Sequence, residues 1–280
     1  MPGEQALRRI VALALDEDLD SDGDITSRAI FGADDRGAAR IITREACTVS
    51  GMKTAAETCL QVDLDLAWLP LVTDGARIPA GAEAARIEGR LVSILSAERT
   101  VLNFLSRLSG IATLTAAYVA AISSTKARIA ATRKTSPGLR LLEKQAVVDA
   151  GGLPHRAGLY DAVLIKDNHI AAAGGIGKSV EAVRKTLGND VEIEVEVETA
   201  DELDEAIDAG VQRVLLDNMS APAVGECCKM AAGRGIVVEA SGGIELTNIM
   251  AYAVAGADII SVGALTRSAP GVDFSLEMSE

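Results

Sequence analysis

The sequence has few aromatic residues, no clustered metal-binding cysteines and no excess of positive charge. Phe, Trp and Tyr make up 2% of its 280 residues while 49% are hydrophobic, so the core must consist mainly of Ala, Val, Ile and Leu. This length allows one large barrel or two modest domains. The formal net charge of -13 argues against a nucleic acid or an anionic membrane as partner, because both need a basic face. An anionic ligand must therefore be held by a local group of basic residues.

The four cysteines form no disulfide or zinc pattern. Cys47, Cys59, Cys227 and Cys228 lack CxxC spacing, and we expect the adjacent pair on a helix as small apolar residues. Residues 1–16 lack the basic start and continuous apolar run of a signal peptide, and no apolar segment is long enough to span a bilayer. We therefore expect a cytoplasmic protein.

The first hundred residues predict a small domain that contains a sheet. Apolar residues at helical spacing predict a helix over 7–15, and a polar loop follows over 16–27. Short β-rich runs at 39–42 and 90–95, separated by glycines and a proline, favour strands in the region 37–95. Leucines and an isoleucine at helical intervals then predict a long helix or helix pair between residues 98 and 123.

The second half of the chain repeats one pattern. Six short β-branched runs each end in a polar residue or glycine, a helical segment generally follows, and the run ends lie 21 to 33 residues apart, as in βα units. Such a series predicts a parallel sheet closed as an α/β barrel, because an open dinucleotide-binding sheet would need a GxGxxG after its first strand. All strand ends of a barrel meet at one mouth. The residues brought together there are Arg133, Lys134, Lys166, Glu196, Asp217, Ser241 and Gly263.

The basic residues at this mouth predict an anion site. Arg133, Lys134, His155, Arg156 and Lys166 lie at strand ends or in the adjoining loop. Arginine suits bidentate recognition of a carboxylate, whereas lysine supplies a point charge. Each residue alone is more simply explained by pairing with the many carboxylates of an acidic protein, but five together favour a substrate carboxylate or phosphate.

Two acidic residues end neighbouring strands. Glu196 and Asp217 suit a magnesium ion, ribose hydroxyls or the positive charge of an oxocarbenium-like sugar, and an ion pair with Lys166 is the alternative. Alternate residues of the strand around Glu196 are glutamates from Glu192 to Glu198. We do not expect all four glutamates to be functional.

Glycine-containing turns follow the last two strands. Barrels frequently bind phosphate there through backbone N–H groups and a helix N-terminus. The residues of these turns are Ser241, Gly242, Gly243, Val262 and Gly263. The two histidines make no zinc site: His155 is expected at the anion site, and His169 is either part of that site or an organiser of its loop.

Nine motifs in this order resemble the quinolinate phosphoribosyltransferase family over essentially the full chain. They are GDITS (23–27), ERT with NFL and LSGIAT (98–113), TRKT with PG (132–138), HRAGL (155–159), LIKDNH (164–169), EVEV (194–197), LDN (216–218), SGG (241–243) and GALT (263–266). This resemblance implies an N-terminal α+β open sandwich domain, residues 1–104 joined by 266–280, and an incomplete, seven-stranded-like α/β barrel, residues 105–265.

The resemblance also implies an activity and roles for residues. The reaction would convert quinolinate and phosphoribosyl pyrophosphate to nicotinate mononucleotide, carbon dioxide and pyrophosphate in NAD biosynthesis, with Mg²⁺ as cofactor. The two quinolinate carboxylates would be bound by Arg133, His155, Arg156 and Lys166, with Arg99 contributed across a homodimer interface, and Lys134 would lie at the same site. Glu196 and Asp217 would face the ribose and the metal, directly or indirectly, and the late glycine turns would bind the 5'-phosphate. Lys134, Lys166, Glu196 and Asp217 are the expected catalytic residues.

Three positions depart from the family pattern. Ala150 stands in place of the first of three glycines, Pro154 in place of asparagine before the His-Arg pair, and Arg267 in place of a histidine. Pro154 removes a side-chain donor and a backbone N–H, so we expect weaker substrate binding or a reshaped loop.

Three alternatives stay open at this point. A molybdenum-associated relative has the same fold, although the stretches at 164–169 and 216–218 resemble the quinolinate enzyme. A Schiff-base lyase would use Lys166 as its nucleophile. A non-catalytic dicarboxylate-binding protein would use the basic residues alone. The sequence leaves any assembly beyond the dimer open.

Overall fold

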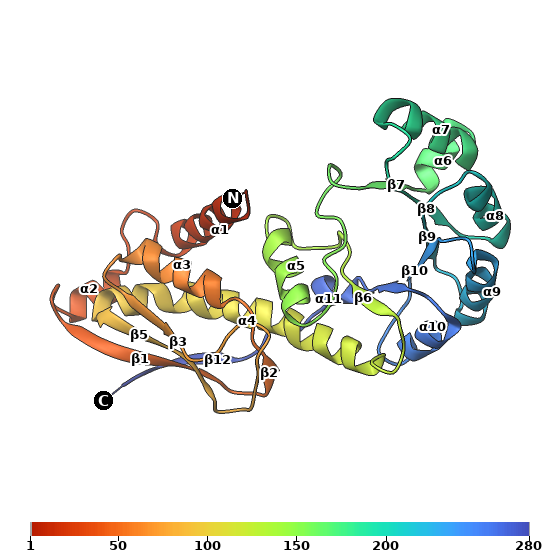
Figure 1. Cartoon of the computed structure of the whole chain (residues 1–280). Helices are drawn as coiled ribbons and strands as arrows, with labels where there is room; N and C mark the ends of the chain where they lie inside the picture. Colours follow the sequence, from red (N-terminus) through yellow and green to blue (C-terminus); the bar gives the residue numbers. More distant parts are fainter. Residues whose placement is uncertain (1, 280) are drawn as a thin grey trace. The chain divides into compact units, whose positions relative to one another are not determined.

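A computed structural model describes residues 2–279, and these form two compact units (Figure 1). Unit 1 contains the described residues of Met1–Ala116 and Thr266–Glu280 together with Thr135–Gly151, and unit 2 contains Ala117–Lys134 and Gly152–Leu265. These units are defined by how the chain packs and not by function. The predicted division into two functional domains, with residues 1–104 and 266–280 in the first and 105–265 in the second, remains a prediction.

Unit 1 contains an antiparallel sheet with the strand order β12-β1-β5-β3 and a small β2-β4 pair. Its helices are α1 (Pro2–Leu19), α2 (Ile25–Ile30), α3 (Met52–Val62), most of α4 (Leu91–Ala121) and α5 (Arg140–Asp149). Its strands are β1 (Arg36–Thr43), β2 (Cys47–Thr48), β3 (Ala67–Pro70), β4 (Arg77–Ile78), β5 (Glu83–Arg90) and β12 (Phe274–Met278). The helix α11 (Ala264–Arg267) begins in unit 2 and ends in unit 1. The antiparallel sheet with its helices confirms the predicted N-terminal α+β domain.

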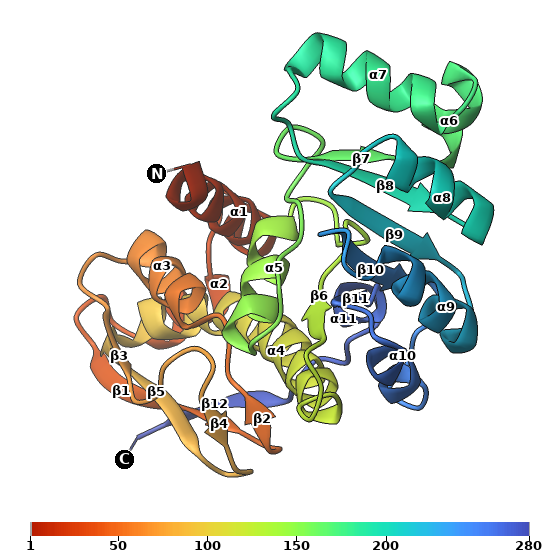
Figure 2. The ribbon, with the colours of Figure 1, turned by 45° about the vertical axis from the view of Figure 1, so that its right-hand side comes forward.

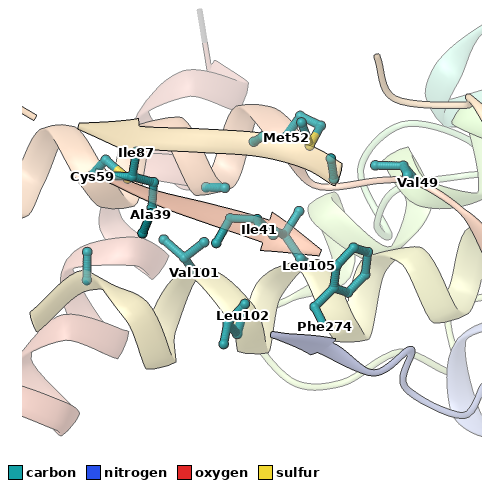
Figure 3. Packing of buried hydrophobic residues seen from close by; sticks show 14 of the residues in the cluster. Ala39, Ile41, Val49, Met52, Cys59, Ile87, Val101, Leu102, Leu105 and Phe274 are labelled. Atoms are coloured by element: carbon teal, nitrogen blue, oxygen red, sulfur yellow. The ribbon is translucent and has the colours of Figure 1, made fainter. Parts of the chain in front are cut away.

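The core of unit 1 lies between its sheet and α4. Alternate residues of β1 and β5 are buried, and Ile41 and Ile87 are fully enclosed. Val101 and Leu105 of α4 point toward these strands (Figure 3). Each buried aliphatic side chain contributes roughly 1.5–3 kcal/mol relative to an exposed one, so this packing holds α4 against the sheet.

The predicted strand at 90–95 is wrong. β5 ends at Arg90, and residues 91–95 form the first turns of α4. The buried residues of α4 recur at helical spacing from Ile94 through Ala97 and Val101 to Leu105. A short apolar run has no decisive period of its own, so the longer helical pattern after it determines its structure.

α4 is 31 residues long and, by length and composition alone, is apolar enough to cross a membrane. The expectation that no segment has this length is therefore wrong. Within its most apolar window 56% of the residues are buried inside the protein. This burial is typical of a core helix, because a membrane-spanning helix needs an apolar surface facing lipid.

Unit 2 is an incomplete α/β barrel, as predicted. Its six strands are all parallel in the order β6-β11-β10-β9-β8-β7, and a parallel bridge from Leu153 to Ala130 adds a seventh position beside β6. The helices α6 to α10 lie along the outer side of these strands (Figure 2). The strands are β6 (Arg128–Ala130), β7 (Val163–Ile165), β8 (Ile193–Val197), β9 (Arg213–Asp217), β10 (Val237–Ser241) and β11 (Ile259–Ser261). The helices are α6 (Asp167–Ala173), α7 (Ile176–Leu187), α8 (Ala200–Asp208), α9 (Ala221–Ala231) and α10 (Ile249–Ala255).

The six predicted β-branched runs are the six strands of this sheet. α9 also contains Cys227 and Cys228, as expected, and all four cysteines are free. Along β8 the residues Ile193, Val195 and Val197 alternate with Glu194 and Glu196. Because side chains alternate across a strand, the two glutamates share the opposite face from the three aliphatic residues. That face, the barrel interior, carries the polar residues described below.

Asp63 ends α3 and joins three segments of unit 1. Its buried carboxylate accepts hydrogen bonds from Nε of Arg90 at 2.8 Å and from Oγ of Ser93 at 2.6 Å, and also from the Asp65 N–H at 3.0 Å. Burial opposes ionisation, but the hydrogen bonds from Ser93, Asp65 and Arg90 outweigh it and lower the pKa of Asp63. The ionised carboxylate therefore stabilises the folded state.

Replacing Asp63 with asparagine should destabilise unit 1 by about 1–3 kcal/mol at pH 7, because hydrogen bonds to a charged partner are lost. The folded pKa is lowered, so this contribution is complete above the unfolded pKa of about 4 and disappears as the pH falls through the folded value. Urea unfolding of both proteins at pH 7 and at stepwise lower pH measures the difference. The exposed Asp65→Asn is the control. A pH-independent difference would contradict the assignment.

Candidate active site

The parallel strands of unit 2 place the predicted residues around one cavity. This cavity has a volume of about 210 Å³. Of the predicted residues, those that line it are Arg133, Lys134, His155, Arg156, Lys166, Glu196, Asp217 and Ser241. Ser241 is in register with Asp217 on one side and Ser261 on the other, so these side chains share one level of the barrel. Residues from five strand ends and one loop therefore converge as the spacing predicted.

Two arginines and two lysines make one part of the cavity basic. Burial and the neighbouring charge of Arg133 lower the pKa of Arg156. Two guanidinium groups this close repel each other in the absence of an anion, so a bound carboxylate would relieve the repulsion. Lys134 is exposed, and its backbone N–H donates to Oγ1 of Thr132 at 3.1 Å. This part of the site is suited to a dianion.

Two carboxylates form the acidic part. Glu196 accepts a hydrogen bond from Nζ of Lys166, and Asp217 accepts one from Nδ2 of Asn218 at 2.6 Å. Nζ of Lys166 is thus engaged by Glu196, whereas a Schiff-base nucleophile needs an accessible neutral amine. His169 organises the loop, because its Nδ1 accepts from the backbone N–H of Lys166 at 2.9 Å.

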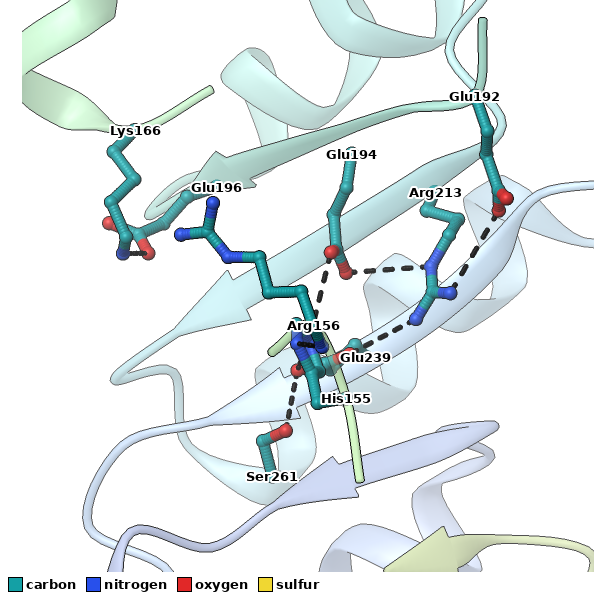
Figure 4. Close-up of polar contacts among 9 residues, drawn as sticks. All are labelled: His155, Arg156, Lys166, Glu192, Glu194, Glu196, Arg213, Glu239 and Ser261. Carbon is teal, nitrogen blue, oxygen red and sulfur yellow. Dashed lines mark hydrogen bonds and ion pairs between the residues drawn. The ribbon is translucent and has the colours of Figure 1, made fainter. Parts of the chain in front are cut away.

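A network of charged groups extends from the cavity into the barrel interior, and two of its members, His155 and Glu239, line the cavity (Figure 4). Nε2 of His155 is 3.2 Å from Oε1 of Glu239 and 3.8 Å from Oε2 of Glu194. Arg213 contacts both carboxylates, with distances of 3.3 Å to Glu239 and 3.6 Å to Glu194. Oγ of Ser261 donates to Glu239 at 2.6 Å. The interior of this barrel is therefore filled partly by paired charges.

The two buried glutamates have opposite pKa shifts. Burial and the charge of Glu239 raise the pKa of Glu194 to about 7, although Arg213 and His155 oppose the shift. Burial also acts against ionisation of Glu239, but His155, Ser261 and Arg213 outweigh it and lower the pKa of Glu239. Glu239 is therefore the carboxylate that remains charged.

Sequence reasoning missed Glu239, Arg213 and Ser261. Arg213 begins β9 and Glu239 lies in the middle of β10, whereas the sequence pattern points to residues at the ends of strands. Ser261 ends β11, but the β-branched run in the sequence continues to Val262. The alternation of Glu239 with Val238 and Ala240 was an available signal. Among the four alternating glutamates near β8, Glu194 and Glu196 face the site. Glu192 and Glu198 are exposed, and Glu192 lies 3.9 Å from Arg213.

Of the predicted phosphate turns, Ser241 lines this cavity, whereas Gly242, Gly243, Val262 and Gly263 do not. A side chain at Gly242 would place its Cβ 2.2 Å from Oδ1 of Asn218, and φ is +94°, so this position requires glycine. A Cβ at Gly263 would lie 3.3 Å from Cδ of Lys134. Gly243 has open space beside it, and the Val262 N–H donates to Ala130 at 3.0 Å.

Arg99 lies on α4 in unit 1 and is exposed. It does not line the cavity of unit 2. The three departures from the family pattern are placed as follows. Ala150 is the C-cap of α5, Pro154 is exposed and directly precedes His155, and Arg267 is exposed at the end of α11.

A metal could be held at two places in unit 2. Among residues 2–279, one compact group of potential ligands was found, and it consists of His155, Glu194 and Glu239. Its carboxylates already pair with Arg213 and Ser261. Glu196 and Asp217 supply the oxygen atoms that Mg²⁺ prefers, but with only two carboxylates they fit a metal that brings further ligands from a substrate or water.

Two domain models of one protein family match this chain. The quinolinate phosphoribosyl transferase N-terminal domain matches residues 24–109, and the C-terminal domain of the same family matches residues 111–277. A Bacillus subtilis protein named probable nicotinate-nucleotide pyrophosphorylase (carboxylating) is 40% identical over 257 residues, which cover 92% of this chain and 88% of that protein. A mitochondrial quinolinate phosphoribosyltransferase (decarboxylating) from Nicotiana tabacum is 38% identical, covering 97% of this chain and 82% of that protein.

A solved structure has the same fold throughout. The nicotinate-nucleotide pyrophosphorylase from Francisella tularensis is 41% identical, with a TM-score of 0.94, and the match covers 100% of this chain and 98% of that chain. Both domain matches, the sequence identity and the shared fold agree with the resemblance of the nine motifs. The chain belongs to the quinolinate phosphoribosyltransferase family.

Proposed function

We propose that this protein transfers a phosphoribosyl group to quinolinate, with loss of carbon dioxide, to form nicotinate mononucleotide and pyrophosphate in NAD biosynthesis. The observation that carries this proposal is a single cavity divided into a basic and an acidic part, in a chain of this family. A dicarboxylate substrate needs the first part. A sugar that develops positive charge needs the second.

The basic part suits the two carboxylates of quinolinate. Arg133 and Arg156 would each bind a carboxylate through paired N–H donors, and Lys134 adds a point charge. Binding of the dianion would offset the repulsion between the two arginines. Lys166 lies between the two parts, because it lines the cavity and pairs with Glu196. It would therefore orient both substrates.

The acidic part suits the reacting sugar. The bond from C1 of the ribose to pyrophosphate breaks and leaves positive charge on the sugar, which Glu196 and Asp217 would stabilise. The pyridine nitrogen then donates its electron pair to C1. The resulting ring cation holds the electron pair left at C2 when the carboxylate departs as carbon dioxide, and a proton from solvent completes the product. The protein mainly positions the reactants and excludes water.

Magnesium and the glycine turns would hold the second substrate. Mg²⁺ bound to phosphoribosyl pyrophosphate would neutralise charge on the leaving pyrophosphate, with Glu196 and Asp217 facing the ion directly or through water. The backbone N–H groups of the turns at Ser241–Gly243 and Val262–Gly263 would bind the 5'-phosphate. Lys134 lies beside Gly263 and adds a positive charge at this end.

A homodimer would complete the site. Arg99 is exposed on α4 and is absent from the lining of the cavity in its own unit 2, which supports its contribution to a partner's site. The acidic composition and the small-molecule chemistry support a cytoplasmic enzyme that has no nucleic-acid or membrane partner.

The proposed function predicts which products the protein forms. Purified protein with Mg²⁺, quinolinate and phosphoribosyl pyrophosphate should release one carbon dioxide for each nicotinate mononucleotide formed. Chromatography of the nucleotide and trapping of labelled carbon dioxide measure the two products. A folded protein that forms no product would overturn the proposal, and omission of each component is the control.

The proposed carboxylate site predicts the effect of removing Arg133 or Arg156. Arg133→Ala and Arg156→Ala should each weaken quinolinate binding by about 2 kcal/mol, or roughly thirtyfold, because a charged hydrogen bond to a carboxylate is lost. Titration calorimetry with quinolinate measures the dissociation constant. Arg128→Ala, at the exposed opposite end of β6, should bind as the native protein does. Unchanged affinity in both site variants would contradict their role.

The proposed homodimer predicts that Arg99 acts in the site of the partner subunit. Arg99→Ala and Arg133→Ala should each be nearly inactive alone. When the two are mixed under conditions that exchange subunits, about half of the dimers contain both kinds of chain and each has one intact site, so about one quarter of native activity should return. If Arg99 acts in its own chain, mixing restores no activity.

A further inference from the structure

His155 lines the cavity, but both of its ring nitrogens face the protein. Nδ1 accepts a hydrogen bond from the backbone N–H of Arg156 at 2.8 Å, and Nε2 lies 3.2 Å from Oε1 of Glu239. An acceptor nitrogen carries no proton, so the proton of the neutral ring lies on Nε2 and points to Glu239. Neither nitrogen is available to a substrate carboxylate in this arrangement.

The backbone at His155 is also constrained. Its φ is +52°, a left-handed conformation that is unfavourable for a non-glycine residue. The hydrogen bond from Arg156 to the ring of His155 stabilises this turn. The orientation of the His155 ring therefore determines the direction of the backbone at the next residue, Arg156, and so the direction of its side chain. In Figure 4 the ring lies beside Glu239, and the guanidinium of Arg156 extends toward Glu196 and Lys166.

Glu239 is held rigidly by the barrel wall. Its side chain is fully buried, and Oε1 accepts from Ser261 at 2.6 Å while Oε2 lies 3.3 Å from Arg213. Arg213 is held in turn by Glu194. These four residues come from the adjacent strands β8, β9, β10 and β11. The Glu239 carboxylate thus fixes the loop that contains His155 relative to these strands.

We infer that Glu239 is a positioning residue that acts through His155 to orient Arg156 for binding of one substrate carboxylate. This inference rests on the proposed function and adds a specific role to it. Through these contacts Glu239 supports His155, and His155 supports Arg156.

The same groups have the composition of a metal site, but their contacts favour positioning. Ligand atoms of His155, Glu194 and Glu239 lie within 4.8 Å of one another. Both carboxylates already contact the Arg213 guanidinium, and a divalent cation between them would be repelled by it. Metal analysis of the native protein separates the two explanations.

The experiment compares Glu239→Ala, Glu239→Gln and the control Glu192→Ala. Glu192 also contacts Arg213, at 3.9 Å, but its side chain is 63% exposed and does not reach His155. Separate titrations measure the dissociation constants of quinolinate and of phosphoribosyl pyrophosphate with Mg²⁺. Thermal melting reports folding, and steady-state assays give KM and kcat.

Glu239→Ala should weaken quinolinate binding by about tenfold to a hundredfold, by analogy with the loss of an outer partner that orients a metal-binding histidine. Its KM for quinolinate should rise with a smaller change in kcat. Binding of phosphoribosyl pyrophosphate should change by less than about threefold, because Glu239 does not orient the acidic part. Glu239→Gln should restore part of the affinity, since its amide oxygen can accept from Nε2 of His155. Glu192→Ala should bind both ligands normally.

Several results would overturn the inference. Glu239→Ala with native quinolinate affinity, or with equal losses for both ligands, excludes a positioning role. A stoichiometric metal in the native protein that Glu239→Ala loses would identify a metal site instead. Native protein that binds no quinolinate overturns the proposed function as well, whereas native binding with an unaffected Glu239→Ala overturns this inference alone.

A second pair of variants tests the inference if Glu239→Ala does not fold. Asparagine tolerates a left-handed backbone, and its side-chain oxygen can accept the Arg156 N–H. His155→Asn should therefore bind quinolinate more tightly than His155→Ala. Equal loss in the two variants contradicts positioning and indicates that the imidazole itself binds the substrate.

Discussion

Burial of charge in the barrel interior is the constraint on which the site depends. Barrel interiors are usually filled by branched aliphatic side chains, yet here Glu194, Arg213 and Glu239 lie on adjacent strands and contact one another in the interior. An unpaired ion costs several kcal/mol when it is buried, so each of these groups needs its partner at a fixed place. The register that pairs Glu194 with Arg213 across β8 and β9 satisfies this need. The strands, the network and the loop at His155 are therefore mutually dependent.

This network also supports the basic part of the mouth. The charges of the floor are paired within the protein, whereas the basic residues Arg133, Lys134 and Arg156 gather on one part of the mouth. The whole protein carries a net charge of -13, so long-range attraction does not bring an anion to this place. Recognition must instead come from short-range hydrogen bonds at a rigid surface. A paired floor beneath an arginine cluster provides that rigidity.

The sequence predicts the helices and strands that show a clear hydrophobic period, and it predicts the site residues that directly follow a strand. The run from Asp258 to Val262 is β-branched and ends at glycine, and it forms β11; Lys166 directly follows a similar run and lies in the cavity. The role of Glu239 had no such signal, because it depends on contacts with residues more than twenty positions away. Residues 90–95 were misread because their own pattern fits either structure and α4 packing decides between them.

The proline before His155 is accommodated by the same geometry. Leu153 is bridged to β6 in parallel: its N–H donates to Ile129, and its carbonyl accepts from Ala131. A residue before proline prefers this extended conformation, so Pro154 agrees with the bridge that precedes it. The chain must then reverse at His155, and the ring contacts with Glu239 and Arg156 stabilise that turn. Pro154 has no side-chain donor to hold the loop. The bridge at Leu153 and the ring contacts of His155 hold it instead, so the loop depends on His155 for its orientation.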